Sequence, residues 1–176
     1  MDADAIGAAF QALSDELGRR HTNGEICLLG GTAMVLAFRT RQTTKDVDAI
    51  FEPATVIRDS AAIVAEIMAL PKDWLNDAAK AFLSERHQVQ LYDLPQFDHL
   101  RVVAPVPEYL LAMKVLASRI GSPGEADDRA DIRFLLRHLA LRTVDEAVAV
   151  AVRYYPVERL PVRAQYLLEE LLKEQS

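Results

Sequence analysis

Apolar residues recur at helical spacing near the start of the chain and form short runs further along. Between residues 6 and 17 they lie on one side of an amphipathic helix. Residues 26–29 form an apolar run typical of a buried strand, which Gly30-Gly31 ends. The elements expected next are a short buried helix over 32–38, a polar loop over 39–45 and a strand over 46–51.

The character of the chain changes from mixed to helical near residue 107. The elements expected before it are helices over 55–70 and 73–85 and strands over 88–92 and 100–104. The remainder is predicted to be helical, with breaks at 121–124, after Leu141 and at Pro156. The sequence therefore predicts an α/β (α+β) fold with a small mixed sheet flanked by helices. Residues 1–106 would form this core, and 107–176 a helical half packed on it.

Composition excludes several classes of protein. The chain has 176 residues, of which 51% are hydrophobic and 26% charged, as in a globular protein with an ample core. The net charge of −6 argues against indiscriminate nucleic-acid binding, so any RNA contact must be local. The single cysteine, Cys27, excludes an internal disulfide framework. The chain shows neither a signal peptide nor an apolar segment of roughly 20 residues, so we expect a cytoplasmic protein without membrane contact.

The first candidate for chemistry is the glycine pair between a predicted strand and a predicted helix. A phosphate can approach Gly30 and Gly31 closely, and the helix start offers N–H donors and a positive dipole end. Thr32 adds a hydroxyl, and Arg41 and Lys45 in the next loop can neutralise phosphate charge. The alternative is an ordinary tight turn followed by a solvated loop.

The second candidate is Asp46-Val47-Asp48 in a predicted strand. Residues two apart in a strand share a face, so the two carboxylates would repel each other without a cation or a proton. Hard cations such as Mg²⁺ prefer such oxygen ligands, while Val47 and Ile50 are expected to face the core. The alternative is a polar strand face in solvent. Together, a phosphate cradle and a metal site are the parts that nucleotidyl transfer needs.

These motifs resemble the polymerase-β-like nucleotidyltransferase superfamily, in particular small bacterial nucleotidyltransferases related to the AbiEii-type toxins of toxin–antitoxin systems. The stretches that carry the resemblance are Leu28–Ala33, Thr44–Asp48, Trp74–Asp77, Tyr109–Lys114 and Asp127-Asp128 followed by Asp131. The resemblance implies transfer of a nucleoside monophosphate from a nucleoside triphosphate to an acceptor hydroxyl. It further implies Mg²⁺ or Mn²⁺ at Asp46 and Asp48, a tRNA end or other RNA as acceptor, and a cognate antitoxin as partner.

Lys114 lies within an apolar stretch that predicts a helix. A lysine there must extend to solvent or meet an anionic partner. Asp128 and Asp131 begin the next predicted helix, where they either cap it or contact Lys114. The resemblance implies that Lys114 contacts phosphate and that Asp128 or Asp131 completes the active site.

Three arginines, Arg129, Arg133 and Arg137, recur every four residues in the same predicted helix. They either bind an RNA backbone or pair with nearby acids. The chain departs from the superfamily because the strand predicted over 100–104 carries no third carboxylate. It also has Gln42 where toxin relatives often carry an arginine. The alternative function is therefore a catalytically degenerate module of the same fold that binds a nucleotide or a partner protein.

Overall fold

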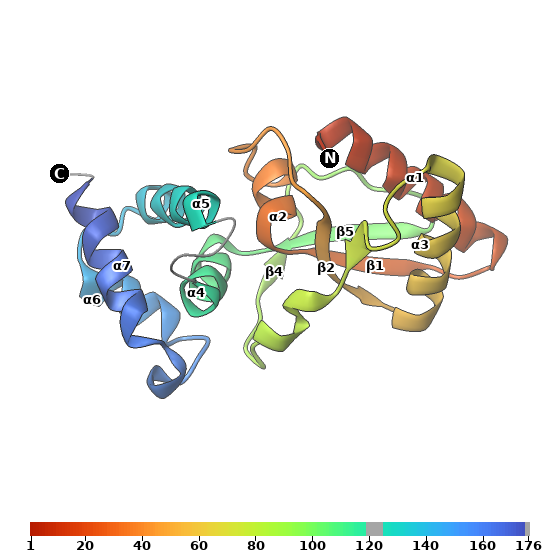
Figure 1. The fold of residues 1–176 in the computed structure, drawn as a ribbon. Helices are drawn as coiled ribbons and strands as arrows, with labels where there is room; N and C mark the ends of the chain where they lie inside the picture. Colours follow the sequence, from red (N-terminus) through yellow and green to blue (C-terminus); the bar gives the residue numbers. More distant parts are fainter. Residues whose placement is uncertain (119–124, 175–176) are drawn as a thin grey trace. The chain divides into compact units, whose positions relative to one another are not determined.

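The computed structural model describes residues 1–118 and 125–174 and divides into two compact units, shown in Figure 1. The first unit comprises Met1–Ala81 and Val89–Ala104, and the second comprises Phe82–Gln88 and Pro105–Ser176. The mixed α/β class predicted from the sequence is confirmed. The break predicted at 121–124 lies outside the described residues.

The elements up to residue 105 include three α-helices, one 3-10 helix and five strands. They are α1 (Ala3–Arg19), β1 (Gly24–Leu28), α2 (Gly30–Leu36), β2 (Val47–Glu52), α3 (Ala54–Met68), β3 (Leu75–Asn76), η1 (Ala78–Phe82), β4 (Val89–Gln90) and β5 (Leu100–Pro105). The elements that follow in the described residues are helical. They are α4 (Pro107–Ala117), α5 (Glu125–His138), α6 (Val144–Ala151), η2 (Val157–Arg159) and α7 (Val162–Lys173).

The five strands form one mixed sheet in the order β3-β2-β1-β5-β4. β1 is antiparallel to β2 and parallel to β5, and β2 is parallel to β3. The register places Ile26 opposite Phe51 on one side and opposite Val102 on the other. All three side chains are buried, so this face of the central strands forms the core. Helices α1 and α3 lie side by side and pack together in this unit (Figure 1).

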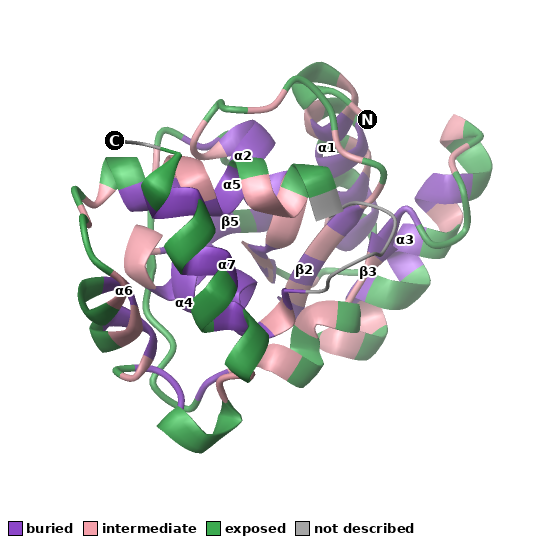
Figure 2. Ribbon diagram, turned by 60° about the vertical axis from the view of Figure 1, so that its left-hand side comes forward, coloured by how far each residue is buried: buried purple, intermediate pink, exposed green. Residues whose placement is uncertain are grey.

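Strand β2 has one buried face and one half-buried face (Figure 2). Val47, Ala49 and Phe51 are buried, whereas Asp48 and Ile50 are half-buried. The expectation that Ile50 faces the core with Val47 is wrong, because positions three apart in a strand point to opposite faces. Ile50 therefore shares the half-buried face of Asp48.

The helix predicted over 73–85 is wrong, because Leu75–Asn76 forms strand β3 and Ala78–Phe82 a 3-10 helix. Strand β2 needs a partner on its outer edge, and the N–H of Val47 donates to the carbonyl of Trp74 at 2.7 Å. The buried Trp74 indole donates to the carbonyl of Ala61 at 3.0 Å. These tertiary bonds hold the segment extended, and local helical spacing cannot compete with them.

Residues 82–88 belong to the second unit, although the sequence placed them within 1–106. The N–H of Ser84 donates to the hydroxyl of Tyr109 at 2.9 Å. The N–H of Val106 donates to the carbonyl of Gln88 at 3.0 Å, and the Tyr154 hydroxyl donates to the Gln88 side chain at 2.8 Å. These bonds join a loop to helices that follow it in sequence, a pairing that no local pattern encodes.

Helix α4 is the central helix of the second unit. Its residues from Tyr109 to Leu116 are all buried, and it packs against α5 and α6, while α7 packs against α5 and α6. The core contains Leu135, Leu168 and Leu171. Helix α6 begins with a capping box in which Thr143 and Glu146 satisfy each other's backbone N–H groups. In the described part of the chain, no helix has both the length and the apolar character needed to cross a membrane.

The bond between Ser84 and Tyr109 predicts a measurable loss of stability. We expect Tyr109→Phe to lower the free energy of unfolding by about 1–3 kcal/mol, because it leaves a buried N–H without its acceptor. Urea unfolding followed by circular dichroism measures this. Tyr166→Phe, at a residue that is 68% exposed, is the matched control. Equal unfolding midpoints for the two variants would contradict the placement of residues 82–88.

Candidate functional site

Asp48 lies on the half-buried face of β2, and half-buried Asp46 lies in the bend directly before the strand, which begins one residue later than predicted. The backbone of Asp46 is tightly held. The hydroxyls of Thr32 and Thr44 each donate to the Asp46 carbonyl at 3.1 Å. The Asn76 side-chain amide donates to Asp46 Oδ2, also at 3.1 Å. Helix α2, the loop before β2 and strand β3 thus converge on one residue. Asp46 is therefore placed by three separate parts of the first unit.

Asp48 lies against Gly30. The N–H of Leu29 donates to the Asp48 carbonyl at 2.8 Å, and this bond brings the residue before α2 next to strand β2. A methyl group added to Gly30 would lie 2.8 Å from Asp48 Oδ2, and Gly30 has a φ of +51°. Both the contact and the left-handed backbone require glycine at this position.

Gly31 has a comparable role toward the loop that precedes β2. An added methyl group would lie 2.7 Å from Thr44 Oγ1 and 3.0 Å from Arg41 Nη1. A carboxylate and a guanidinium group therefore lie against consecutive glycines. The pair was expected to admit a phosphate to the backbone. In the structure, the space that the missing side chains leave is used by Asp48 on one glycine and by Arg41 and Thr44 on the next.

Two other residues predicted for nucleotide binding differ from expectation. Thr32 is fully buried, and its hydroxyl donates to the Asp46 carbonyl instead of facing a ligand. It therefore tethers α2 to the start of β2. Lys45 is exposed beside Asp46 in the sequence, and the structure does not bring its side chain into the contacts that join Gly31, Arg41 and Thr44.

The donor set of Asp46 and Asp48 suits a hard divalent cation. Both are half-buried, Asp48 within β2 and Asp46 directly before it. Among the residues that the structure describes, no group of three or more histidine, cysteine, aspartate or glutamate side chains converges. Mg²⁺ is commonly held by one or two carboxylates, with waters and substrate phosphates completing its shell. The two residues fit that arrangement.

Lys114, Asp128 and Asp131 form a cluster in the second unit. Lys114 Nζ lies 2.6 Å from Asp131 Oδ2 and 3.2 Å from Asp128 Oδ1. The side chains of Lys114 and Asp131 are 8% and 2% exposed, whereas that of Asp128 is 46% exposed. The sequence left open whether Lys114 extends to solvent or meets an anionic partner, and in the structure it pairs with two aspartates. The sheet site lies in one unit and this cluster in the other.

The arginine stripe of α5 pairs with acids in its own unit. Arg129 lies within 2.9 Å of Glu170 and 3.2 Å of Glu174, and Arg133 also pairs with Glu174. Arg137 is exposed. Two of the three guanidinium groups are thus engaged by carboxylates of α7, which is the second of the two interpretations that the sequence allowed.

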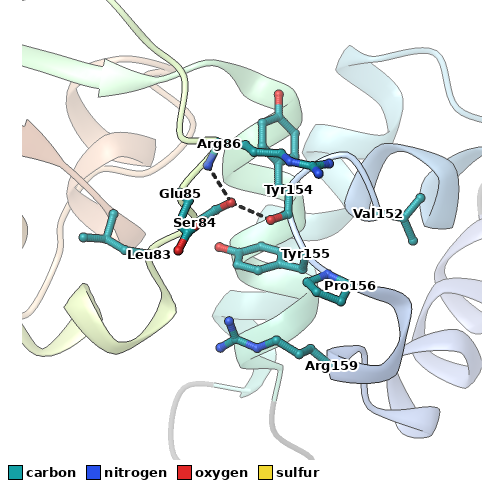
Figure 3. Close-up of a pocket in the computed structure, with 9 residues that line it drawn as sticks. All are labelled: Leu83, Ser84, Glu85, Arg86, Val152, Tyr154, Tyr155, Pro156 and Arg159. Carbon is teal, nitrogen blue, oxygen red and sulfur yellow. Dashed lines mark hydrogen bonds between the residues drawn. The ribbon is translucent and has the colours of Figure 1, made fainter.

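A pocket of about 560 Å³ lies in the second unit (Figure 3). Its lining includes Arg86, Arg159 and the rings of Tyr154 and Tyr155, and the Ser84 hydroxyl donates to the carbonyl of Tyr154. Burial raises the pKa of both tyrosines, so their phenols stay neutral. The Tyr155 hydroxyl donates to the carbonyl of Phe82. The phenols therefore hold residues 82–88 in place.

Comparisons of the chain with protein-family models, with curated proteins and with solved structures returned no match. The resemblance of the motifs to nucleotidyltransferases thus remains a prediction.

Sequence reasoning missed Asn76 as a site residue. It placed Asn76 inside a helix, whereas the residue ends β3 and its side-chain oxygen accepts from the N–H of Ala78 at 3.1 Å. Asparagine followed by aspartate is turn chemistry, which was the available signal against a continuous helix. The contact with Asp46, thirty residues earlier in the chain, had no local signal.

The buried ion pair predicts a large effect of removing its cation. We expect Lys114→Met to lower the free energy of unfolding by about 3–5 kcal/mol, because it leaves the Asp131 carboxylate buried without its partner. Adding Asp131→Asn removes that charge, so the double variant recovers part of the loss. Lys72→Met, at an exposed lysine, is the control in the same denaturant titrations. A Lys114→Met protein as stable as this control would contradict the pairing.

Proposed function

We propose that the protein is a metal-dependent nucleotidyltransferase. It transfers a nucleoside monophosphate from a nucleoside triphosphate to an acceptor hydroxyl. Asp46 and Asp48 hold Mg²⁺ or Mn²⁺, and Arg41 beside the Gly30-Gly31 turn contacts the phosphates. When bound, the cation would neutralise part of the negative charge on the triphosphate.

The contact of a carboxylate and a guanidinium group with consecutive glycines carries this proposal. Asp48 Oδ2 lies 2.8 Å from the position that a methyl group added to Gly30 would take. Arg41 Nη1 lies 3.0 Å from the corresponding position at Gly31. A cation ligand and a phosphate ligand therefore adjoin one short turn. A triphosphate needs both, because its oxygens require a cation on one side and hydrogen-bond donors on the other. The half-buried carboxylates of Asp46 and Asp48 complete the support.

The reaction that these groups serve is a displacement at the α-phosphorus. The acceptor oxygen forms a bond to that phosphorus, and the bond from the phosphorus to the oxygen bridging to the β-phosphate breaks. Pyrophosphate leaves, and the proton of the acceptor hydroxyl passes to a carboxylate or to water. Arg41 stabilises the charge that gathers on the phosphate oxygens, since a guanidinium group is a fixed donor fork for phosphate.

From the resemblance we also propose a phosphate-contacting role for Lys114, within the second unit by itself, with Asp128 and Asp131 holding its ammonium group. An ammonium group has three donors, so pairing with two carboxylates leaves one for a phosphate oxygen. Asp131 is buried against the ammonium and orients it. Asp128 is the more exposed of the two acids, and we propose that it is the one that meets a ligand.

RNA, with a tRNA end as the first candidate, is the acceptor that we propose from the resemblance to toxin–antitoxin toxins, and a cognate antitoxin is the corresponding partner. Because Arg129 and Arg133 are already paired with carboxylates, an RNA backbone on α5 would have to displace Glu170 and Glu174. Exposed Arg137 is the more accessible member of the stripe.

The second candidate is a catalytically degenerate module of the same fold that binds a nucleotide or a partner protein. The observation that favours it is the donor set, since Asp46 and Asp48 are joined by no further carboxylate, histidine or cysteine in a group of three or more among the described residues. Such a module would bind a nucleotide without transferring it.

We expect the protein to transfer label from a nucleoside triphosphate to RNA when it is incubated with Mg²⁺, each of the four labelled nucleotides and total RNA. Removing a carboxylate ligand costs several kcal/mol of charge stabilisation, so Asp46→Asn and Asp48→Asn are each expected to slow transfer about 100-fold or more. Gel electrophoresis and scintillation counting of the labelled products measure the rate.

Asp59→Asn, which removes an exposed carboxylate of α3, is the matched control and keeps full activity. Label on protein or on small molecules would replace RNA as the acceptor and leave the transferase proposal standing. Nucleotide binding with no transfer to any acceptor would favour the degenerate module, and neither binding nor transfer would refute both.

A further inference from the structure

Asn76 lies on β3, the strand next to β2, and is close to both Asp46 and Asp48. The parallel register of β2 and β3 pairs Val47 with Leu75 and Asp48 with Asn76. From this position Asn76 Nδ2 reaches Asp46 Oδ2 at 3.1 Å. The amide therefore contacts one aspartate and stands across the ladder from the other.

The orientation of the Asn76 amide is set by its second bond. Its Oδ1 accepts from the N–H of Ala78 at 3.1 Å, so the amide NH₂ is the end that faces Asp46. Strand β3 itself is anchored, since the carbonyl of Trp74 accepts from Val47 and the Trp74 indole is buried. A donor is thus held at a defined place against the carboxylate.

We propose that Asn76 is a positioning residue of the metal site. Its amide fixes the Asp46 carboxylate and occupies one oxygen, which leaves the other to face the cation. Two neighbouring carboxylates repel each other, and a neutral donor offsets this repulsion without adding charge. Groups that hydrogen-bond to metal-ligating carboxylates typically change metal affinity 10–100-fold. This inference rests on the proposed function.

The amide also sets the charge of the site. Strand β5, whose predicted range 100–104 carries no third carboxylate, is separated from β2 by β1. Strands β1 and β3 both adjoin β2, and the residue of β3 opposite Asp48 is Asn76. The site therefore keeps two negative charges, and the phosphates of a bound nucleotide supply the rest. We infer that the cation binds more tightly with a triphosphate than alone.

Asn76→Asp separates positioning from a merely structural role. The variant keeps an oxygen that accepts from the N–H of Ala78, so the turn after β3 is preserved. It loses the donor and places a negative charge against Asp46. We expect the melting temperature of the metal-free protein to fall by several degrees, and Mn²⁺ to raise it by more than in the wild type. Asp46→Asn combined with Asn76→Asp reverses the direction of the hydrogen bond and restores the metal-free melting temperature.

Isothermal titration calorimetry with Mn²⁺ alone completes the test. We expect Asn76→Ala to raise the dissociation constant 10–100-fold. Asn23→Ala, at an exposed asparagine of the same unit, is the control and leaves it unchanged. A third titration adds a non-hydrolysable nucleoside triphosphate to the wild type, where Mn²⁺ is expected to bind more tightly.

The outcomes distinguish this inference from the proposed function. Wild-type protein that binds no Mn²⁺, with or without nucleotide, refutes the metal site. Wild-type protein that binds Mn²⁺ while Asn76→Ala binds it equally well refutes the role of Asn76 alone. An Asn76→Asp variant that matches the wild type in metal-free melting and in its response to Mn²⁺ does the same, because it shows that only the turn matters.

Discussion

The two-faced character of β2 is the constraint on which the rest of the first unit depends. One face carries Val47, Ala49 and Phe51 into the core. The register with β1 aligns Ala49 and Phe51 with buried residues of that strand. Because alternate side chains point to opposite faces, burying the apolar set necessarily presents Asp48 on the other side. A slip of one residue would bury its carboxylate, so packing of the core and placement of this acid are the same requirement.

Around this strand the structure uses backbone contacts to hold charged side chains close together. The Asp46 carbonyl accepts from two threonine hydroxyls, and the Asp48 carbonyl accepts from Leu29. Such contacts place the carboxylates without using their own oxygens. Glycine at positions 30 and 31 removes the side chains that would collide with Asp48 and Arg41. The site is thus held mainly through its backbone, with the Asn76 amide as a side-chain contact to Asp46.

The second unit solves a different problem, the burial of a charge. Lys114 lies within a helix whose residues are buried from Tyr109 to Leu116, and a lone ammonium there would be strongly destabilising. Asp131 satisfies it from within the core and Asp128 from the edge. The same pairing that makes the lysine tolerable also fixes its orientation. Folding stability alone does not require such a buried ion cluster, since apolar residues of similar volume in its place are often as stable.

Patterns along the chain were sufficient for elements whose periodicity is local. The helix over 6–17, the strand over 26–29 and the strand over 46–51 correspond to α1, β1 and β2 within a few residues. The prediction that Asp46 and Asp48 share a strand face holds only for Asp48 as a strand residue, since β2 begins at Val47. The sequence by itself thus determined the fold class and the two candidate motifs.

Tertiary structure alone decided the partners of those motifs. Residues 73–85 have a pattern compatible with a helix, but Leu75–Asn76 pairs with the outer edge of β2 as a strand. That pairing brought Asn76 to Asp46, and the fold likewise buried the Thr32 hydroxyl and gave residues 82–88 to the helical unit. Each of these outcomes depends on hydrogen bonds between segments far apart in sequence. Their donors and acceptors are ordinary residues, and only the fold determines which of them meet.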